Sequence, residues 1–320
     1  METEPSLIHG GAEMQNSKNT IKGIALGLTA TVSWASFYIV SRYFFGTAGD
    51  ELDPLWSSFL RYAIAAAALL LATKPSQFRP ALQKDWKLLL LLGTLGIAGE
   101  STLIFYAMKY TTAARGNLLT NISPIVTAIM SWLITRELFT RRQVAGMVLG
   151  TMATMAIFFL RGGDDFAGGN TSFLLGDLLA VVAGICWSAY TVLGERVVKE
   201  HGPQVTTCLA FMFGAAAMLP ACLLSGSKMT LAISARGWML VLYLGLISSA
   251  LGYLCWYKAL EYLKPGVLGA FGYVSIILTF ILSLICLGEK VSLAFALCLV
   301  LLLLGTGMML KSTTNKDDLI

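Results

Sequence analysis

The chain has 320 residues, of which 56% are hydrophobic and only 13% are charged. Soluble globular domains carry about 25% charged residues, so this composition excludes an ordinary soluble protein. The formal net charge of +5 does not indicate a nucleic-acid partner, because the basic residues stand at the ends of apolar segments, where they face the membrane surface. We therefore expect most of the chain to lie in a lipid bilayer.

Ten apolar segments are long enough to cross the membrane as helices. A crossing helix needs about 20 mainly apolar residues, because backbone polar groups in the hydrocarbon core must be hydrogen-bonded within their own segment. The connections are short, and none has room for a soluble catalytic domain. The sequence therefore predicts an all-α membrane protein with ten transmembrane helices. In chain order the predicted spans are residues 21–41, 55–73, 87–108, 113–134, 143–160, 174–194, 204–224, 237–257, 266–287 and 292–310.

Cysteine and histidine occur where neither a disulfide nor a metal site is expected. All six cysteines fall inside predicted spans of the second half, away from an aqueous oxidising face, and are interpreted as small apolar residues. The two histidines, His9 and His201, lie in a tail and a loop, and the sequence has no CxxC pair. We therefore expect no structural metal, no haem and no other cofactor.

Basic residues are distributed unevenly between the two sides of the predicted topology. With the N-terminus inside, fifteen Lys and Arg residues fall in cytoplasmic segments and seven on the opposite side, while Arg61 lies within a span. Short loops rich in Lys and Arg remain cytoplasmic. The sequence thus predicts a multi-pass protein with both termini in the cytoplasm.

The first half of the chain matches the second at a spacing of about 150 residues. Random apolar sequences share Leu and Ala by composition, but here Gly, Trp, Tyr, Ser, Thr and Glu recur as well. Five spans per copy is an odd number, so the second copy enters the membrane from the other side, which makes the pair an inverted repeat. The matches include Gly23 and Trp34 with Gly176 and Trp187 at a spacing of 153, and Gly93, Tyr110, Ser123, Thr127 and Glu137 with Gly245, Tyr262, Ser275, Thr279 and Glu289 at a spacing of 152.

An inverted repeat has a functional consequence. Exchanging the roles of the two halves gives two near-equivalent conformations, which is the physical basis of alternating access with a substrate site near the midplane. The architecture therefore predicts transport of a small-molecule substrate. The domains that we expect are a cytoplasmic tail at 1–20, a first five-helix repeat at 21–160, a connecting loop at 161–173, a second five-helix repeat at 174–310 and a cytoplasmic tail at 311–320.

Two segments of each half carry a family resemblance. The first runs from Gly23 to Arg42 and from Gly176 to Arg196, and the second from Tyr106 to Glu137 and from Lys258 to Glu289. On these segments the chain resembles the EamA-type transporters of the drug/metabolite transporter superfamily. The resemblance implies a ten-helix exporter or permease of the cell inner membrane, with substrates ranging from amino acids and nucleosides to vitamins and drugs. The first helix lacks the membrane-embedded Glu of the four-helix multidrug exporters in that superfamily, so their coupling mechanism does not carry over.

Glu100 is the strongest single candidate for a functional residue. It stands about 12 residues into the third predicted span, and a carboxylate at such depth costs about 2.5–3.5 kcal/mol on insertion scales, so it should face a cavity or a partner. Glu100 is suited to bind a substrate ammonium or to exchange a proton, which makes protons a second expected partner. The alternative is a structural ion pair, because Arg61 in the second span lies at a similar depth.

The fourth predicted span carries polar groups on one helical face. Asn117, Thr120, Asn121 and Thr127 recur at helical spacing, and the amides suit a zwitterionic or polyhydroxylated ligand. The alternative, which stays open, is hydrogen bonding between helices in a packed seam. Arg115, at the outer end of the same span, is a candidate for attracting a carboxylate or phosphate, although charges at span ends commonly snorkel to the interface.

Aromatic side chains supply the rest of the candidate substrate site. An aromatic residue at a membrane end is commonly an interface anchor, and others pack or face lipid. Trp34 and Trp187 stand out because they are counterparts in the two halves. The aromatic residues that we nominate for substrate contact are Trp34, Tyr38, Trp187, Tyr190, Tyr253 and Trp256.

These observations favour a secondary transporter over the rival functions. The preferred hypothesis is export of an amino acid or related metabolite with proton exchange at Glu100, and the sequence has no phosphate-binding GxxxxGKS or GxxxxGKT motif for ATP. The alternative is a phosphate-sugar or nucleotide-sugar antiporter, which needs two or more basic residues at the site, where only Arg61 and Arg115 are placed. An intramembrane enzyme is disfavoured because the spans contain no histidine, and a channel because a lone carboxylate forms no ring of ion ligands. The substrate, the direction of flux and the choice between monomer and homo-oligomer stay open.

Overall fold

The computed structural model describes residues 18–37, 40, 53–110, 119–161, 171–287 and 293–310. Within these ranges the chain forms helices joined by short connections, and no β-strand is present. The predicted all-α fold class is therefore confirmed for the described part of the chain. Three candidate site residues, Tyr38, Arg115 and Asn117, lie outside the described residues.

The first half begins with a helix over residues 18–37. The next helix, α2, starts close to the predicted position because Asp53 caps it. The Asp53 carboxylate accepts hydrogen bonds from the backbone N–H groups of Leu55 and Trp56, each at 3.0 Å, and Pro54 occupies the first turn,. The elements of this half are α2 (Pro54–Ala72), η1 (Pro75–Gln77), α3 (Phe78–Lys84), α4 (Trp86–Leu91), η2 (Leu92–Gly99), α5 (Glu100–Tyr110), α7 (Ser123–Met130), η3 (Ser131–Thr135) and α8 (Arg141–Arg161).

The second half begins with a helix of 31 residues, α9 (Thr171–His201). Its end is set by Gly202, whose φ of +83° is a left-handed conformation that favours glycine. The helix continues past the apolar segment that defined the predicted span, and His201, expected in a loop, is its last residue. The remaining elements are α10 (Pro203–Ser225), α11 (Ala235–Tyr243), η5 (Leu244–Leu251), α12 (Gly252–Ala259), α13 (Pro265–Gly269), α14 (Phe271–Leu287) and α15 (Leu293–Leu310).

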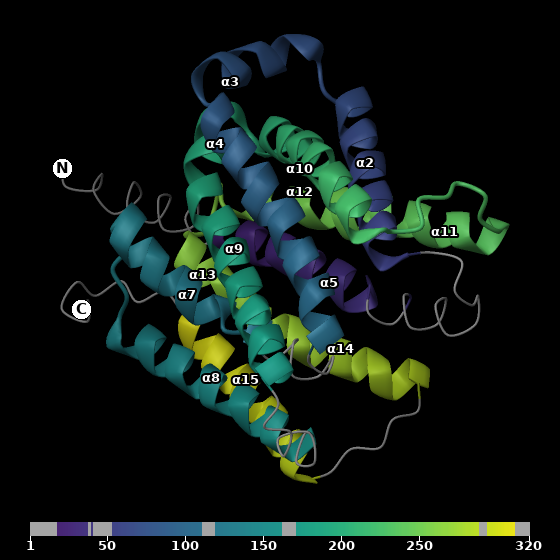
Figure 1. The fold of residues 1–320 in the computed structure, drawn as a ribbon. Helices are drawn as coiled ribbons and strands as arrows, with labels where there is room; N and C mark the ends of the chain where they lie inside the picture. The colour runs from purple at the N-terminus through teal and green to yellow at the C-terminus, as the bar shows by residue number, and fades with distance from the viewer. Residues whose placement is uncertain are drawn as a thin grey trace, which may run out of the picture.

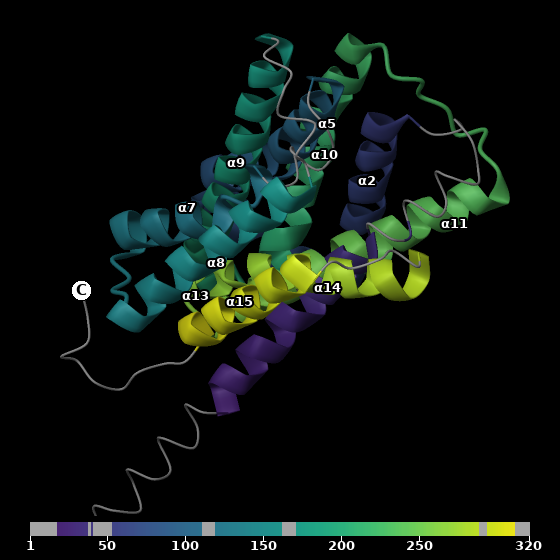
Figure 2. The same ribbon diagram turned by 90° about the horizontal axis from the view of Figure 1, so that it is seen from below.

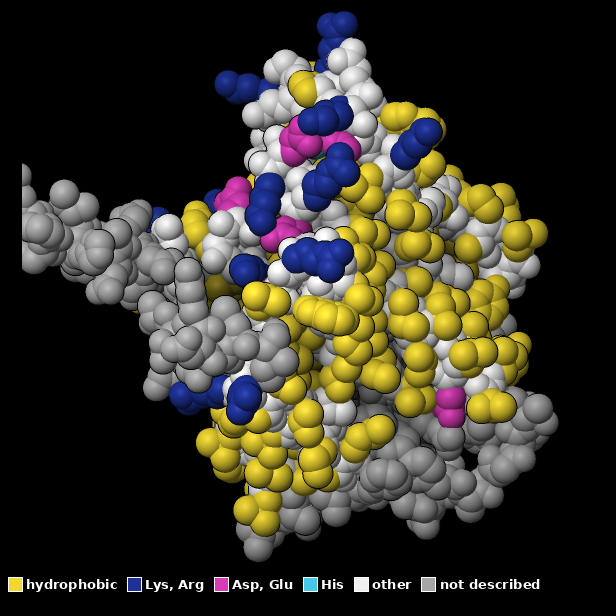
Figure 3. All heavy atoms as spheres, turned by 90° about the vertical axis from the view of Figure 1, so that its left-hand side faces the viewer, with side chains coloured by type: hydrophobic (Ala, Val, Ile, Leu, Met, Phe, Trp, Pro, Cys, Tyr) yellow, Lys and Arg dark blue, Asp and Glu magenta, His cyan; other side chains and the backbone are white. Residues whose placement is uncertain are grey.

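Several of these helices have the length and composition of membrane spans. Many of their large apolar side chains face outward, with Leu71 89% and Leu224 88% exposed, and Figure 3 shows a broad apolar surface beside a region of charged side chains. Such a surface is stable in lipid and not in water. The chain is therefore a membrane protein. Among the described residues, the helices long and apolar enough to cross a membrane are Leu55–Ala72, Trp86–Ile104, Leu174–His201, Pro203–Ser225 and Ala235–Ala259, and shorter apolar helices lie at Ser123–Thr135, Pro265–Thr279 and Ala296–Leu310.

Helices from the two halves pack against one another throughout the molecule. α8 and α15 lie side by side at one edge (Figures 1 and 2). α10 packs against α2 and η2, and α9 packs against α5 and α7. The largest cluster of buried apolar side chains therefore draws on both halves and centres on α2, η2, α9, α10 and α12.

The described elements repeat with a fixed offset around two π-helical stretches. η2 spans Leu92–Gly99 and η5 spans Leu244–Leu251, so every residue of one has a counterpart in the other at the spacing of 152 found in the sequence. In both halves the stretch follows an α-helix directly and continues into another, α4 into α5 and α11 into α12. A π-helical stretch widens the helix by one residue per turn, and such stretches occur often at functional sites.

Each π-helical stretch crosses a helix of the opposite half at a glycine. A Cβ atom added to Gly93 would come within 2.7 Å of the carbonyl oxygen of Ala210 and 2.8 Å of the backbone nitrogen of Gly214, both in α10. A Cβ atom added to Gly245, the counterpart of Gly93, would come within 2.7 Å of Ile64 in α2. Close backbone approach at small residues is the usual means of packing helices in a membrane.

Replacement of Gly93 by alanine is expected to destabilise the contact between the halves. The atoms that the new methyl group would meet belong to the backbone of α10, so the helices must separate, and overpacking of this kind costs about 1–3 kcal/mol. The measurement is thermal unfolding of the purified protein in detergent. The matched control is Gly307→Ala, because a Cβ atom there meets nothing within 4 Å. An unfolding temperature of Gly93→Ala equal to that of the control would contradict the expectation.

Candidate functional site

Aromatic side chains from both halves meet in one cluster. The Trp34 ring centroid lies 5.1 Å from that of Trp187 and 5.1 Å from that of Trp256, and 5.4 Å from the ring of Tyr253. The Trp34 indole N–H donates a hydrogen bond of 3.1 Å to the carbonyl oxygen of Ser248 in η5. The structure thus brings Trp34 and Trp187, counterparts in the sequence, into direct edge-to-face contact.

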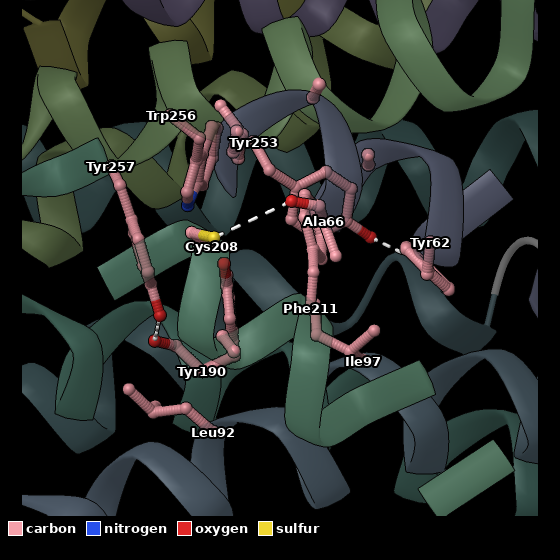
Figure 4. Close-up of a cluster of buried hydrophobic side chains, with 14 of the residues drawn as sticks. Tyr62, Ala66, Leu92, Ile97, Tyr190, Cys208, Phe211, Tyr253, Trp256 and Tyr257 are labelled. Carbon is pink, nitrogen blue, oxygen red and sulfur yellow. Dashed lines mark hydrogen bonds between the residues drawn. The ribbon is translucent and has the colours of Figure 1, made fainter. Parts of the chain in front are cut away.

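Tyr190 and Tyr257 extend this aromatic cluster. Tyr190 stacks on Tyr257 with centroids 4.5 Å apart, and the Tyr257 hydroxyl donates to the Tyr190 carbonyl oxygen at 3.0 Å (Figure 4). The Trp256 indole N–H donates to the Thr191 hydroxyl at 3.1 Å. Tyr190, Tyr253 and Trp256 are buried, whereas Trp34 and Trp187 keep partly exposed rings. Trp34 and Trp187 are therefore the members of this cluster that keep accessible surface.

Polar side chains form a connected network next to the aromatic cluster. Glu100 is the first residue of α5, directly after η2, and its Oε2 atom accepts a hydrogen bond of 3.1 Å from the Ser101 hydroxyl. The Ser101 Oγ atom lies 2.9 Å from the Tyr62 hydroxyl oxygen, and the Tyr62 hydroxyl oxygen lies 3.1 Å from that of Tyr253. Arg61 Nη2 donates to Tyr62 Oη at 2.5 Å and to Ser101 Oγ at 3.4 Å. One network therefore contains both charges that the sequence indicated.

Arg61 is held by rings and hydroxyl groups. Its guanidinium carbon lies 5.2 Å from the centroid of the Phe37 ring and 4.4 Å from that of Tyr62, within the range of cation–π attraction. Its Nε atom is buried and has no hydrogen-bond partner. Arg61 and Glu100 attract each other electrostatically, and the hydrogen bonds that connect them pass through Ser101. The guanidinium thus keeps donors that a bound anion can occupy.

The polar stripe of the fourth predicted span divides into two parts. Thr127 is buried, and it lies against Gly269 of α13, where a Cβ atom would come within 3.1 Å of the threonine side chain. Thr120 donates a hydrogen bond of 3.5 Å to the Ala180 carbonyl oxygen in α9. These contacts support the helix-seam interpretation for both threonines. Asn121 is partly buried in the turn before α7.

Tyr62 and Ser101 are the members of the network that sequence reasoning missed. A serine in an apolar helix commonly bonds to a backbone carbonyl of its own helix, and a tyrosine there commonly packs or anchors at the interface, so neither residue type indicates a function by itself. The signal that was present is adjacency, because each hydroxyl residue directly follows an ionisable residue within an apolar segment.

A separate cluster of charged side chains joins the start of α4 to the end of α9. Asp85 accepts from Arg196 Nη2 at 3.3 Å and lies 2.8 Å from His201 Nε2, while Lys84 forms an ion pair with Glu200. Asp85, Glu200 and His201 offer three ligand atoms within 4.8 Å of one another. A divalent cation would have to displace both Lys84 and Arg196, so these groups fit an ion-pair cluster better than a metal centre.

Comparison with protein families identifies the chain. Residues 21–159 and 174–311 each match the model of the EamA-like transporter family. The chain belongs to this family. Its function class is therefore transport rather than enzymatic catalysis.

Individual relatives of this EamA-like protein cover most of its length. It is 28% identical over 274 residues to an uncharacterized transporter of Archaeoglobus fulgidus, covering 85% of this chain and 91% of that protein. It is 27% identical over 260 residues to the uncharacterized transporter YyaM of Bacillus subtilis, covering 79% and 83% of the two chains. A protein of Streptantibioticus cattleyicolor named "probable terminal-alkyne amino-acid exporter" is 24% identical over 271 residues, covering 83% and 85%.

A solved structure supports the fold of this EamA-like protein. A crystal structure superimposes on it with a TM-score of 0.74 at 22% sequence identity, covering 91% of this chain and 96% of the other. At that identity the similarity shows a shared fold alone.

Glu137 of this EamA-like transporter lies between η3 and α8, outside the apolar helices. Its side chain is buried, and its Oε2 atom accepts hydrogen bonds from the Ser131 hydroxyl and, at 2.9 Å, from the backbone N–H of Gly266 at the start of α13. Burial raises the pKa of the Glu137 carboxyl above its usual value, and the two donors together with Lys264 offset the rise only in part,. Glu137 therefore connects η3 to the start of α13.

Replacement of Glu137 by glutamine is expected to make stability less dependent on pH. Because the pKa of Glu137 is raised on folding, the folded protein binds this proton more tightly than the unfolded chain. Its contribution to stability is therefore fully present below the unfolded pKa and declines as the pH rises through the folded pKa. Glutamine keeps an oxygen acceptor for Ser131 and Gly266 but does not ionise.

Thermal unfolding in detergent, followed from about pH 4 to about pH 8, checks this expectation for Glu137. The unfolding temperature of the unmodified protein should fall relative to that of Glu137→Gln as the pH rises. Glu261→Gln, which removes an exposed carboxylate, serves as the control. Parallel pH curves for the unmodified protein and Glu137→Gln would show that burial of this carboxyl has no such effect.

Proposed function

We propose that this EamA-like transporter exports an amino acid or a related zwitterionic metabolite across the cell inner membrane by alternating access. In this proposal ten spans form two inverted five-helix repeats, at residues 21–160 and 174–310, and both termini are cytoplasmic. Glu100 and Arg61 bind the two charged ends of the substrate between the halves. Glu100 also exchanges protons during transport.

The repetition of the helices supports alternating access. The π-helical stretches η2 and η5 have matching bounds, and each crosses a helix of the opposite half, Gly93 on α10 and Gly245 on α2. The family model also matches the chain twice. Two similar units with reciprocal contacts have two near-equivalent ways to pack, and exchange between them moves access from one side of the membrane to the other.

The observation that carries the substrate class is the presence of opposite charges in one network beside two partly exposed tryptophans. Glu100 provides an acceptor for an ammonium group, and Trp34 and Trp187 provide ring faces that attract a cation. Arg61 has a buried Nε atom without a partner, which suits a carboxylate held by two parallel hydrogen bonds. A single guanidinium matches a carboxylate better than the double charge of a phosphate ester, which favours an amino acid over a sugar phosphate.

The ion-pair cluster supports one part of the proposed topology, in which two basic segments lie on the same side of the membrane. Its residues come from two segments, 74–87 and 195–201, that the distribution of basic residues places on the cytoplasmic side. The structure brings these segments together through Asp85, Arg196 and His201. Segments that share one ion-pair cluster lie on the same side of a membrane.

Counterflow with the purified protein in liposomes tests the proposed function. The panel contains amino acids, nucleosides and cationic drugs, each measured with and without a pH gradient. We expect amino acids to drive exchange and nucleosides to give none. Exchange of nucleosides or drugs in the absence of amino-acid exchange would overturn the proposed substrate class.

Glu100→Gln is expected to remove the pH-driven part of transport and to weaken substrate exchange by about tenfold or more. Glutamine does not ionise, and the loss of a charge-assisted hydrogen bond of about 1.5–3 kcal/mol corresponds to at least that factor. The control is Glu261→Gln, which changes an exposed carboxylate in the turn after α12. If pH-driven exchange by Glu100→Gln equalled that of the control, the proton role of Glu100 would be abandoned.

A further inference from the structure

The hydroxyl groups of Ser101, Tyr62 and Tyr253 connect Glu100 to α12 of the opposite half, and in the proposed function substrate binding by the two charges uses none of them. We infer that Tyr62 is a positioning residue that links the protonation of Glu100 to the contact between the two halves. The link is the hydrogen-bond chain from Tyr253 through Tyr62 and Ser101 to Glu100. This inference rests on the proposed function, in which Glu100 exchanges protons.

The hydrogen bonds of this chain have a single direction when Glu100 is ionised. A serine hydroxyl has one hydrogen, and that of Ser101 is donated to Glu100 Oε2,. The 2.9 Å contact between Ser101 and Tyr62 therefore has Tyr62 as the donor. The Tyr62 oxygen is left with lone pairs only, so it accepts from Arg61 Nη2 at 2.5 Å and from the Tyr253 hydroxyl at 3.1 Å. All three hydroxyl hydrogens thus point along the chain toward the carboxylate.

Tyr62 is fixed at the junction of the halves. Its side chain is fully buried, and its ring lies 5.4 Å from that of Phe211 in α10 and 6.1 Å from that of Tyr253 in α12 (Figure 4). Ser101 and Glu100 approach it from α5 of its own half. The Tyr62–Tyr253 hydrogen bond is therefore the link through which this series of hydrogen bonds passes from the first half of the protein to the second.

The charge of Glu100 sets the strength of the chain. Hydrogen bonds to an ionised acceptor are roughly twice as strong as those between neutral groups, and bonds in series polarise one another. A proton on Glu100 removes the charge at the accepting end and weakens each link, including the one between Tyr62 and Tyr253. Among the described residues, the ionisable groups that interact electrostatically with this carboxylate are Arg61 from α2, Tyr253 from α12 and Cys186 from α9. Tyr62 from α2 is connected to it through Ser101.

The consequence concerns movement of the halves. Separation of α2 from α12 must break the hydrogen bond between Tyr62 and Tyr253, and the Tyr253 hydroxyl has no other hydrogen-bond partner among the described residues. Breaking this bond costs less when Glu100 carries a proton than when it is ionised. Protonation of Glu100 therefore favours separation of the halves at this point, and no covalent bond is made or broken.

Tyr62→Phe tests the link because it keeps the ring contacts and removes the hydroxyl. Exchange of an amino acid is measured in liposomes at about pH 5 and about pH 8, and the ratio of the two rates is compared with that of the unmodified protein. This ratio measures the pH dependence of exchange. We expect the substitution to reduce it by at least about threefold while exchange continues. Tyr253→Phe removes the partner hydroxyl and is expected to give the same result, which keeps the test open if one variant does not fold.

The matched control is Tyr273→Phe. The Tyr273 hydroxyl is also buried, but it lies 2.8 Å from Thr151 Oγ1 in α8, outside the chain to Glu100. The inference is overturned if Tyr62→Phe and Tyr253→Phe keep the full pH dependence while Glu100→Gln loses it, an outcome that leaves the proposed function intact. It is also overturned if Tyr273→Phe changes the ratio equally. If Glu100→Gln itself keeps the full pH dependence, the proposed proton role fails first, and the inference fails with it.

Discussion

Lipid offers no hydrogen-bond partners, so polar groups within the membrane are costly unless they find partners in the protein. The backbone meets this requirement by forming helices. Hydroxyl side chains meet it by bonding within their own helix, as Thr207 does to the Pro203 carbonyl oxygen at 2.7 Å. The same constraint acts on Arg61 and Glu100, whose charges are too costly to leave alone. Because these charges need partners, Arg61 and Glu100 form a hydrogen-bond network with Tyr62, Ser101 and Tyr253. Tyr253 belongs to the other half, so this network also joins the two halves.

The constraint also accounts for the chemical difference between the halves. Glu100 follows η2, and its counterpart Gly252 follows η5. A Cβ atom on Gly252 would come within 2.9 Å of the Trp34 indole nitrogen, so that position has no room for any side chain. Trp34 occupies the space and bonds to Ser248. One side of the symmetric frame therefore holds a carboxylate and the other holds an indole, and a substrate bound between them meets two different surfaces.

Sequence hydropathy predicted the all-α membrane fold class because it records which segments are apolar, and the offset of 152 residues reappears in the bounds of η2 and η5. The sequence repeat also identified Trp34 and Trp187 as counterparts, and the two side chains do contact each other. It gave no sign of the π-helical geometry, which depends on packing between helices. Nor did it reveal Tyr62 and Ser101 as bridging residues, because an intrahelical hydroxyl and a bridging hydroxyl have the same local sequence. His201 was misplaced because charged residues continue a helix beyond the apolar span.

Besides apolar packing, two kinds of polar contact join the halves, and they respond differently to water. At the end of α9, Lys84 and Arg196 have side chains that are 59% and 69% exposed, so water can replace their ion pairs at little cost. The network around Tyr62 is buried, and parting it leaves polar groups without partners unless a ligand supplies them. In the proposed function a zwitterion supplies a carboxylate to Arg61 and an ammonium to Glu100, so these two charges keep partners when the network around Tyr62 is disrupted. On this proposal, conformational exchange requires the substrate because the substrate replaces polar contacts of Arg61 and Glu100 that the movement disturbs.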